Sequence, residues 1–124
     1  MYIVDSSVWI ALFSETDSQR EKAIAAMSAI GDAQIVVNYG VVLETVTVLE
    51  RNQSKAHANK FVEYITVNNQ VEILNASTQE DCAIYLREKD GLSFVDTLLK
   101  SIARQTRFIL VTFDKRLLQS ANAD

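Results

Sequence analysis

Four acidic residues of this sequence stand in apolar stretches, where charged side chains are uncommon. Asp5 and Asp114 each directly follow a short apolar run, and Glu44 and Asp96 lie inside longer ones. No lysine or arginine lies within one helical turn of Asp5 or Glu44. Carboxylates that gather without cations repel one another and take up protons, and a divalent metal ion relieves that repulsion. A set of carboxylate oxygens suits Mg²⁺ or Mn²⁺ rather than zinc. These acids therefore predict a carboxylate metal site.

Each acid also has an ordinary structural interpretation. Asp5 and Asp114 stand where a helix begins after a strand, so both are candidate N-caps. Asp96 occupies the third helical position of a capping-box pattern, and Lys100, four residues later, is a competing ion-pair partner. Glu44 is alternatively a lone exposed charge on an apolar helix. Capping explains single acids, whereas the metal site explains all four together.

Short apolar strands alternate with helices along the chain. We expect strands at Met1–Val4, Gln34–Val37, Val71–Leu74 and Arg107–Val111, and helices at Ser7–Phe13, Asp17–Ile30, Tyr39–Arg51, Ser54–Thr66, Ser77–Lys89, Ser93–Arg104 and from Asp114 onward. This order predicts an α/β fold with a mainly parallel sheet of four or five strands, flanked by helices on both faces. Ligands of such sheets lie at the carboxyl ends of the strands, which is where Asp5 and Asp114 stand.

The composition limits the class of protein. The chain has 124 residues, three glycines, no proline and no linker, which predicts a single domain over 1–124. With one cysteine, Cys82, and one histidine, His57, it has neither a disulfide framework nor a zinc site built from several of these ligands. We expect Cys82 to be a buried small hydrophobe. No apolar run approaches the roughly 18–20 residues that span a bilayer, and the start carries no basic leader. A cytoplasmic protein without a membrane partner is expected.

The charge balance bears on nucleic acid binding. Twelve basic and sixteen acidic residues give a net charge of −4, which argues against a general nucleic-acid coat protein. Basic residues nevertheless gather near the C-terminus, among them Lys100, Arg104, Lys115 and Arg116. They form either a solvated helix face or a set of phosphate contacts.

Four segments resemble the motifs of PIN-domain ribonucleases. Residues 5–13 resemble the opening motif of that family, 42–46 the second, 92–103 the third and 111–117 the fourth. The segments occur in the family's order and with similar spacing over the whole chain. The stretch 37–40 lacks the proline that often precedes the second motif. The size of the chain is similar to that of VapC-type toxins from bacterial and archaeal toxin–antitoxin pairs.

This resemblance implies a PIN fold in which the four acids meet at one edge of the sheet. It implies an Mg²⁺- or Mn²⁺-dependent endoribonuclease, with transfer RNA or a ribosomal RNA loop as substrate and a cognate antitoxin as partner. Asp5, Asp96 and Asp114 would bind metal directly or through water, and Glu44 would bind metal or orient the attacking water. The Ser6 and Thr112 hydroxyls, beside two of these acids, either donate hydrogen bonds to the metal-binding carboxylates or form capping hydrogen bonds at helix ends.

The resemblance gives two further features a role. Lys100, Arg104, Lys115 and Arg116 would contact RNA phosphates or an antitoxin tail. The apolar side chains of the valine-rich stretch 39–49 and the stripe formed by Ala58, Phe61 and Ile65 exceed what one small sheet face covers, which favours a homodimer.

Three other functions remain open from the sequence. One is a PIN nuclease of RNA processing that has no antitoxin. Another is a non-catalytic interaction domain with the same fold, which predicts neither metal binding nor cleavage. The third, phosphatase chemistry on Asp5, is disfavoured because Ser7 stands where a second aspartate is expected.

Overall fold

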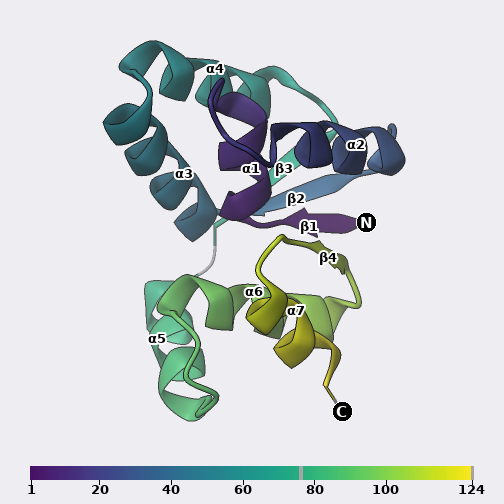
Figure 1. The fold of residues 1–124 in the computed structure, drawn as a ribbon. Helices are drawn as coiled ribbons and strands as arrows, with labels where there is room; N and C mark the ends of the chain where they lie inside the picture. The colour runs from purple at the N-terminus through teal and green to yellow at the C-terminus, as the bar shows by residue number, and fades with distance from the viewer. Residues whose placement is uncertain (76, 124) are drawn as a thin grey trace.

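A four-stranded sheet forms the centre of the computed structural model, which describes residues 1–75 and 77–123 (Figure 1). Its strands are β1 (Tyr2–Val4), β2 (Ile35–Asn38), β3 (Val71–Leu74) and β4 (Ile109–Val111). The helices are α1 (Ser6–Phe13), α2 (Arg20–Ile30), α3 (Tyr39–Asn52), α4 (Lys55–Val67), α5 (Thr78–Arg87), α6 (Phe94–Thr106) and α7 (Lys115–Asn122). The strands pair in parallel in the order β3-β2-β1-β4, which confirms the predicted α/β fold.

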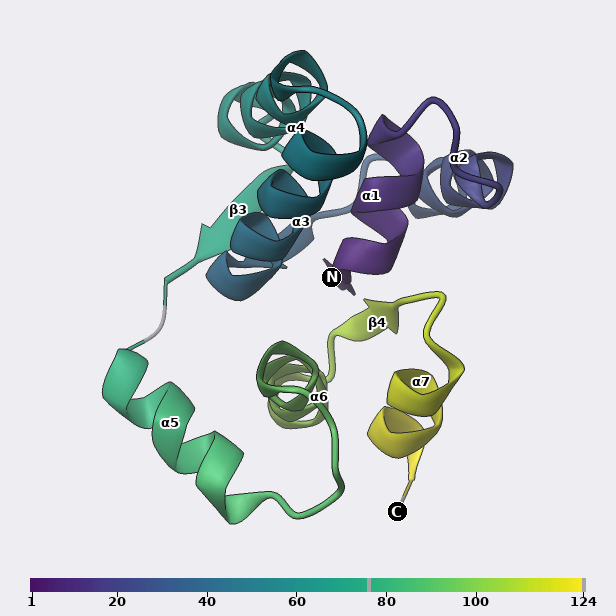
Figure 2. The ribbon, with the colours of Figure 1, turned by 60° about the vertical axis from the view of Figure 1, so that its left-hand side comes forward.

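Helices cover both faces of this sheet, as Figures 1 and 2 show. Helices α1 to α4 lie on one face, and α6 and α7 lie on the other, with α5 packed on the outside of α6. After β1 the chain forms β2 and then β3, with the connecting helices α1 to α4 on the first face. It then reaches β4 through α5 and α6 on the other side of the sheet. The order of strands therefore reverses between β1 and β4. Crevices at the carboxyl ends of strands form at such reversal points.

An aromatic cluster anchors the first face. The fully buried Trp9 ring packs against Phe13, Phe61 and Tyr64, with ring centroids 5.5–6.4 Å apart. Phe61 and its neighbours in the predicted stripe, Ala58 and Ile65, are buried within this same core. Helices α1 and α3 cover this stripe within a single chain, so it leaves no surplus apolar surface for the predicted homodimer to bury.

Two predicted boundaries shift for local reasons. Helix α2 begins at Arg20 rather than Asp17, because the Asp17 carboxylate accepts a hydrogen bond from the Gln19 N–H (2.8 Å) and forms a turn. Strand β4 begins at Ile109 rather than Arg107, because α6 continues to Thr106 and Arg107 takes a left-handed conformation (φ 60°).

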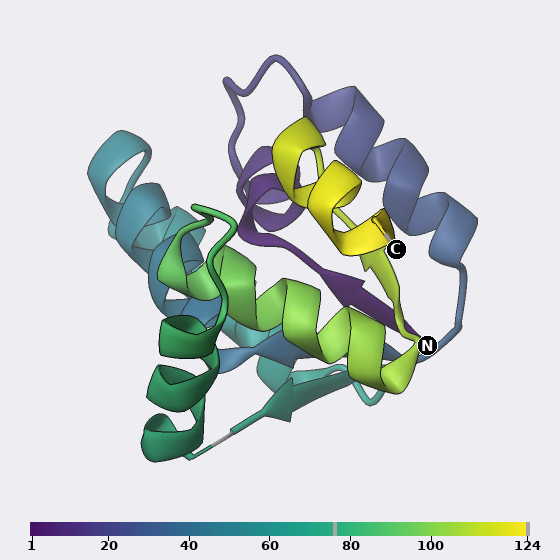
Figure 3. The ribbon, with the colours of Figure 1, turned by 90° about the horizontal axis from the view of Figure 1, so that it is seen from below.

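Cys82 is exposed, so its predicted burial was wrong. It lies on α5, a helix with no buried residue. Figure 3 shows this helix at the margin of the molecule, beside α6. No helix of the described residues is long and apolar enough to cross a membrane.

Candidate active site

Two of the four acids lie at the point where the strand order reverses. Val4 pairs with Val111 at the carboxyl ends of β1 and β4. The next residue, Asp5, donates its backbone N–H to the Val111 carbonyl (2.9 Å). Thr112 and Asp114 follow directly after β4. The parallel pairing of β1 with β4 thus brings the first and fourth motifs together.

Asp5 is held more firmly than its neighbours. Its side chain is buried (3% exposed) and caps α1, with Oδ1 accepting the Ser6 N–H at 2.7 Å. Oδ2 accepts hydrogen bonds from the hydroxyls of Ser7 (2.9 Å) and Thr112 (2.8 Å). The expected donor role of Thr112 agrees with this geometry. Ser7 is a contact that sequence reasoning missed, although its place in the first turn of a helix capped by Asp5 is a usable signal.

Glu44 is tied to Asp5 through a shared hydroxyl. Ser6 Oγ lies 3.1 Å from Glu44 Oε1 and 3.4 Å from Asp5 Oδ1. Glu44 comes from α3, whose first turn approaches α6 closely. A Cβ atom on Gly40 would lie 3.0 Å from a Val95 methyl and 2.9 Å from Asn38 Oδ1. Glycine at position 40 therefore permits the close packing that brings Glu44 toward α6.

Asp96 and Asp114 both lie at the beginnings of helices. The Asp96 N–H donates to Ser93 Oγ (3.2 Å), as the capping-box pattern predicted. Asp114 Oδ1 accepts the N–H groups of Arg116 (3.0 Å) and Leu117 (3.1 Å), and its own N–H donates to Thr112 Oγ1 (3.0 Å). Thr112 thereby connects Asp5 with Asp114.

The electrostatics show that these acids form one group. Partial burial raises the pKa of Glu44 above its ordinary value, and the charges of Asp5 and Asp96 raise it further, against the Ser6 hydrogen bond, which lowers it. Partial burial also raises the pKa of Asp96, as do the charges of Asp5 and Asp114. Among the described residues, neither ion pair involves any of these four carboxylates. Within the described residues, their mutual repulsion is therefore not offset by an ion pair.

The four carboxylates are not arranged to enclose a cation among the described residues. In the part of the chain that the structure describes, no three Asp, Glu, His or Cys side chains are arranged to hold a metal ion as they stand. The carboxylates of Asp5 and Asp114 are instead engaged at helix N-termini. The chemistry of the donor set nevertheless fits a hard divalent cation, since it offers only oxygen atoms and carries excess negative charge.

The predicted basic contacts separate into two groups. Lys100 is buried (8% exposed) and pairs with Asp90, not with Asp96, so neither its predicted ion pair nor its predicted phosphate contact is supported. Arg104 lies in the last turn of α6, beside Phe108 at the amino end of β4 and away from the acids.

The other basic residues follow the fourth acid in the chain, although the Arg116 guanidinium donates to the Asp90 carbonyl (3.4 Å), on the loop before α6. Lys115 and Arg116 are exposed in the first turn of α7, directly after Asp114. The structure adds Lys22 of α2, whose ammonium lies 5.4 Å from the centre of the Phe113 ring. No pattern in the sequence links Lys22 with a residue about ninety positions away.

Comparisons with known proteins agree with this architecture. The family model described as PIN domain matches residues 2–122. VapC20 of Mycobacterium tuberculosis, a toxin that cleaves the sarcin-ricin loop, has a similar structure with a TM-score of 0.84 and 19% sequence identity, over 97% of this chain and 95% of that one. PAE2754 of Pyrobaculum aerophilum is similar with a TM-score of 0.64 and 18% identity, over 98% and 84% of the two chains. No curated protein matches the sequence. At these identities the two structures share the fold, and the match of the family model over nearly all of the sequence shows that the chain belongs to the PIN-domain family.

Proposed function

We propose that this protein is a divalent-metal-dependent endoribonuclease and the toxin of a type II toxin–antitoxin pair. The observation that carries the proposal is the position of Asp5 and Asp114 at the reversal point of the sheet, with Glu44 tied to Asp5 through the Ser6 hydroxyl and with partial burial and neighbouring negative charge raising the pKa of Asp96. Membership of the PIN-domain family supports a nuclease, and the likeness to the VapC20 fold supports a toxin.

Asp5, Asp96, Asp114 and Glu44 are the residues that would hold Mg²⁺ or Mn²⁺. When bound, the metal lowers the pKa of a water molecule and offsets negative charge on the phosphate. The hydroxyls of Ser6, Ser7 and Thr112 hold the carboxylates in place, as hydrogen-bonding neighbours of metal ligands do.

Glu44 would bind the metal or orient the attacking water and accept its proton, since its carboxylate shares the Ser6 hydroxyl with Asp5. The water oxygen bonds to phosphorus while the bond from phosphorus to the 3′ oxygen breaks, and that oxygen takes a proton from solvent. The products carry a 5′-phosphate and a 3′-hydroxyl.

The substrate we propose is a loop of transfer RNA or ribosomal RNA in the cytoplasm. Lys115 and Arg116, beside Asp114, are placed to contact its phosphates, and Lys22 joins them from α2. A cognate antitoxin would cover the same basic surface. We also propose a homodimer, because Tyr85 and Leu86 of α5 remain exposed in the single chain.

Cleavage of total cellular RNA by the purified protein, with Mg²⁺ or Mn²⁺, tests this function beside Asp96→Asn and an EDTA control. Discrete products that need both the metal and Asp96 are expected. Absence of cleavage by folded protein that also fails to bind Mn²⁺ would favour the non-catalytic interaction domain. A housekeeping PIN nuclease is favoured instead if the protein cleaves RNA but no small DNA-binding antitoxin gene lies beside its own.

A further inference from the structure

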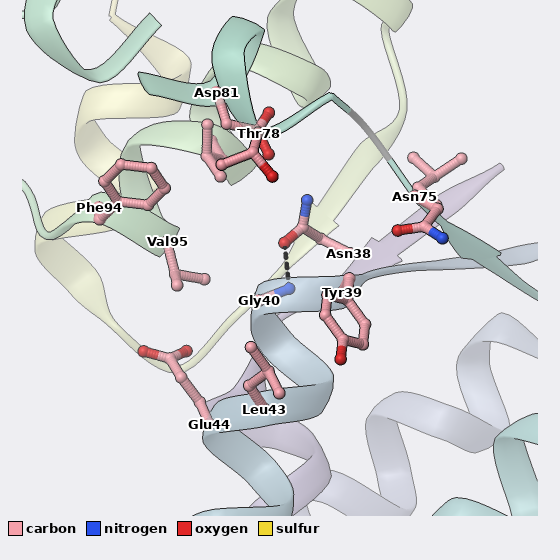
Figure 4. Close-up of a pocket in the computed structure, with 12 residues that line it drawn as sticks. Asn38, Tyr39, Gly40, Leu43, Glu44, Asn75, Thr78, Asp81, Phe94 and Val95 are labelled. Atoms are coloured by element: carbon pink, nitrogen blue, oxygen red, sulfur yellow. Dashed lines mark hydrogen bonds between the residues drawn. The ribbon is translucent and has the colours of Figure 1, made fainter. Parts of the chain in front are cut away.

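A groove of about 410 Å³ lies beside the acid cluster, between the N-terminal ends of α3, α5 and α6 (Figure 4). Its volume falls within the range of sites for small organic ligands. Glu44 lines one end, so the groove is continuous with the carboxylates at the reversal point of the sheet. A nucleotide whose phosphate lies at the acids would have its base within reach of this groove.

The walls of the groove are apolar and partly aromatic. Tyr39 and Leu43 of α3 are about half exposed, and Phe94 of α6 is 39% exposed. The Phe94 ring is held from behind by Tyr85, with ring centroids 5.0 Å apart. Exposed aromatic rings of this kind are the surfaces on which unpaired bases stack.

A buried polar group faces the same space. The Asn38 side chain is only 3% exposed, and its Oδ1 accepts the Gly40 N–H at 2.8 Å. The amide nitrogen of Asn38 points to the side where Thr78 and Asp81 lie, and it has no hydrogen-bond partner among the described residues (Figure 4). This nitrogen is not among the buried unpaired atoms of the described residues, so it is open to the groove, where an acceptor from a ligand can pair with it.

We propose that this groove binds an unpaired base of the RNA substrate next to the cleaved phosphate, and that guanine fits it best. This inference rests on the proposed nuclease function. Guanine presents a carbonyl oxygen beside two N–H donors on one edge. The Asn38 amide donates to the carbonyl, and the Asp81 carboxylate accepts from the N–H groups.

The main competing occupant is a second copy of the chain. In a symmetric dimer the groove would face the same groove of the second copy. None of the residues that line the groove is a lysine or an arginine. Asp81 would then be buried without a positive partner, which is unfavourable. A planar ligand with hydrogen-bond donors would stack on the aromatic rings and form hydrogen bonds with the polar groups of the groove.

Binding of mononucleotides in EDTA tests the groove without metal or cleavage. Chemical shifts in ¹⁵N–¹H spectra of the whole protein would be followed while guanosine, adenosine, cytidine or uridine 5′-monophosphate is added. We expect guanosine monophosphate to bind most tightly and to shift the Asn38 side-chain amide and the Gly40 and Thr78 N–H signals. Absence of saturable shifts at these groups overturns the proposal.

Three variants separate the contributions. Tyr39→Leu keeps apolar bulk but removes the ring, and should weaken binding about fivefold or more. Asp81→Asn should reduce the preference for guanosine over adenosine monophosphate by about tenfold. Glu80→Gln removes the same charge from the neighbouring position, which does not line the groove, and should bind like wild type. Equal binding by wild type, Tyr39→Leu and Asp81→Asn would refute the proposed site.

Sedimentation and cleavage assays on the same samples complete the test. A wild-type dimer that Leu43→Glu dissociates would show that the groove is an interface between copies, which overturns the proposal. RNA cleavage without mononucleotide binding would refute the groove alone. Mononucleotide binding without RNA cleavage would support the groove and refute the nuclease.

Discussion

Replacing Thr112 with valine tests whether hydroxyl groups hold Asp5 in place for metal binding. The Thr112 hydroxyl donates to Asp5 Oδ2 (2.8 Å) and accepts the Asp114 N–H (3.0 Å), so it connects two of the proposed ligands. Valine keeps nearly the same shape and removes these hydrogen bonds together with the contact between the Thr112 and Ser7 hydroxyls (3.3 Å). Because Asp5 is only 3% exposed, water cannot readily replace the lost donor.

The expected effect follows from the charge on Asp5. A hydrogen bond to a charged group contributes about 1.5–3 kcal/mol. Converted to affinity, this range corresponds to roughly 10- to 150-fold. Loss of a hydrogen-bonding neighbour of a metal ligand typically weakens metal binding by about 10- to 100-fold, which agrees with this range. We therefore expect Thr112→Val to bind Mn²⁺ at least about tenfold more weakly than wild type.

Calorimetric titration with Mn²⁺, followed by RNA cleavage at saturating metal, measures this effect. Thr112→Ser restores the hydroxyl and should recover most of the affinity. Thr66→Val is a matched control, because the Thr66 hydroxyl donates only to carbonyl groups of its own helix, α4. If Thr112→Val binds Mn²⁺ as wild type does, the assignment of Thr112 as a support for Asp5 is incorrect.

Three other predictions test the remaining charges of the site. The pKa values of Asp96 and Glu44 are raised, so in EDTA the free energy of unfolding should fall as the pH rises above about 4 through those values. In urea unfolding, the free energy of unfolding of Asp96→Asn should fall less over this pH range than that of wild type, and an equal fall would contradict the proposed repulsion. The variant should be inactive yet no less stable than wild type at neutral pH. Lys100→Met should lose about 1.5–3 kcal/mol in the same assay, because it removes the ammonium group that pairs with the Asp90 carboxylate, and a loss of RNA affinity without a loss of stability would restore Lys100 as a phosphate contact. Arg116→Glu should slow RNA cleavage on the order of tenfold, because attraction to the RNA phosphates is lost. Unchanged cleavage together with weaker antitoxin binding would show that Arg116 contacts the antitoxin instead.

The local patterns of the sequence were sufficient to predict the order of strands and helices. Apolar runs such as Met1–Val4 are short and end at a polar residue, so strands could be distinguished from helices by length. Asp5 directly follows the first strand, and the rule that ligands lie at the carboxyl ends of parallel strands therefore predicted that it belongs to the site. The hydrogen bonds of its carboxylate agree with that position, but metal binding itself stays a prediction.

Contacts between distant segments could not be predicted in the same way. The spacing of four residues makes Lys100 a candidate partner of Asp96, whereas the folded chain places Asp90 of the preceding loop at its ammonium. Ser120 Oγ also donates to the Asp90 carboxylate (3.2 Å), across thirty residues. Periodicity identifies which face of a helix is apolar, but it does not specify which loop packs beside a given side chain.

The burial of the α4 stripe shows a related limit. Phe61 is apolar in a helical pattern, and this pattern alone does not distinguish a dimer face from a core face. The partners of Phe61 are Trp9 and Phe13, about fifty residues earlier. Only the tertiary fold assigns the stripe to the core of a single chain.

The capping roles of two site acids determine which inactive variants can be interpreted. Asp5 accepts the first N–H of α1, and Asp114 accepts two N–H groups of α7. Alanine at either position would remove a helix cap, at a cost of about 0.5–2 kcal/mol, together with the negative charge. Asparagine caps a helix about as well as aspartate does. An alanine scan would therefore mix unfolding with loss of chemistry at these positions, whereas asparagine substitutions separate the two.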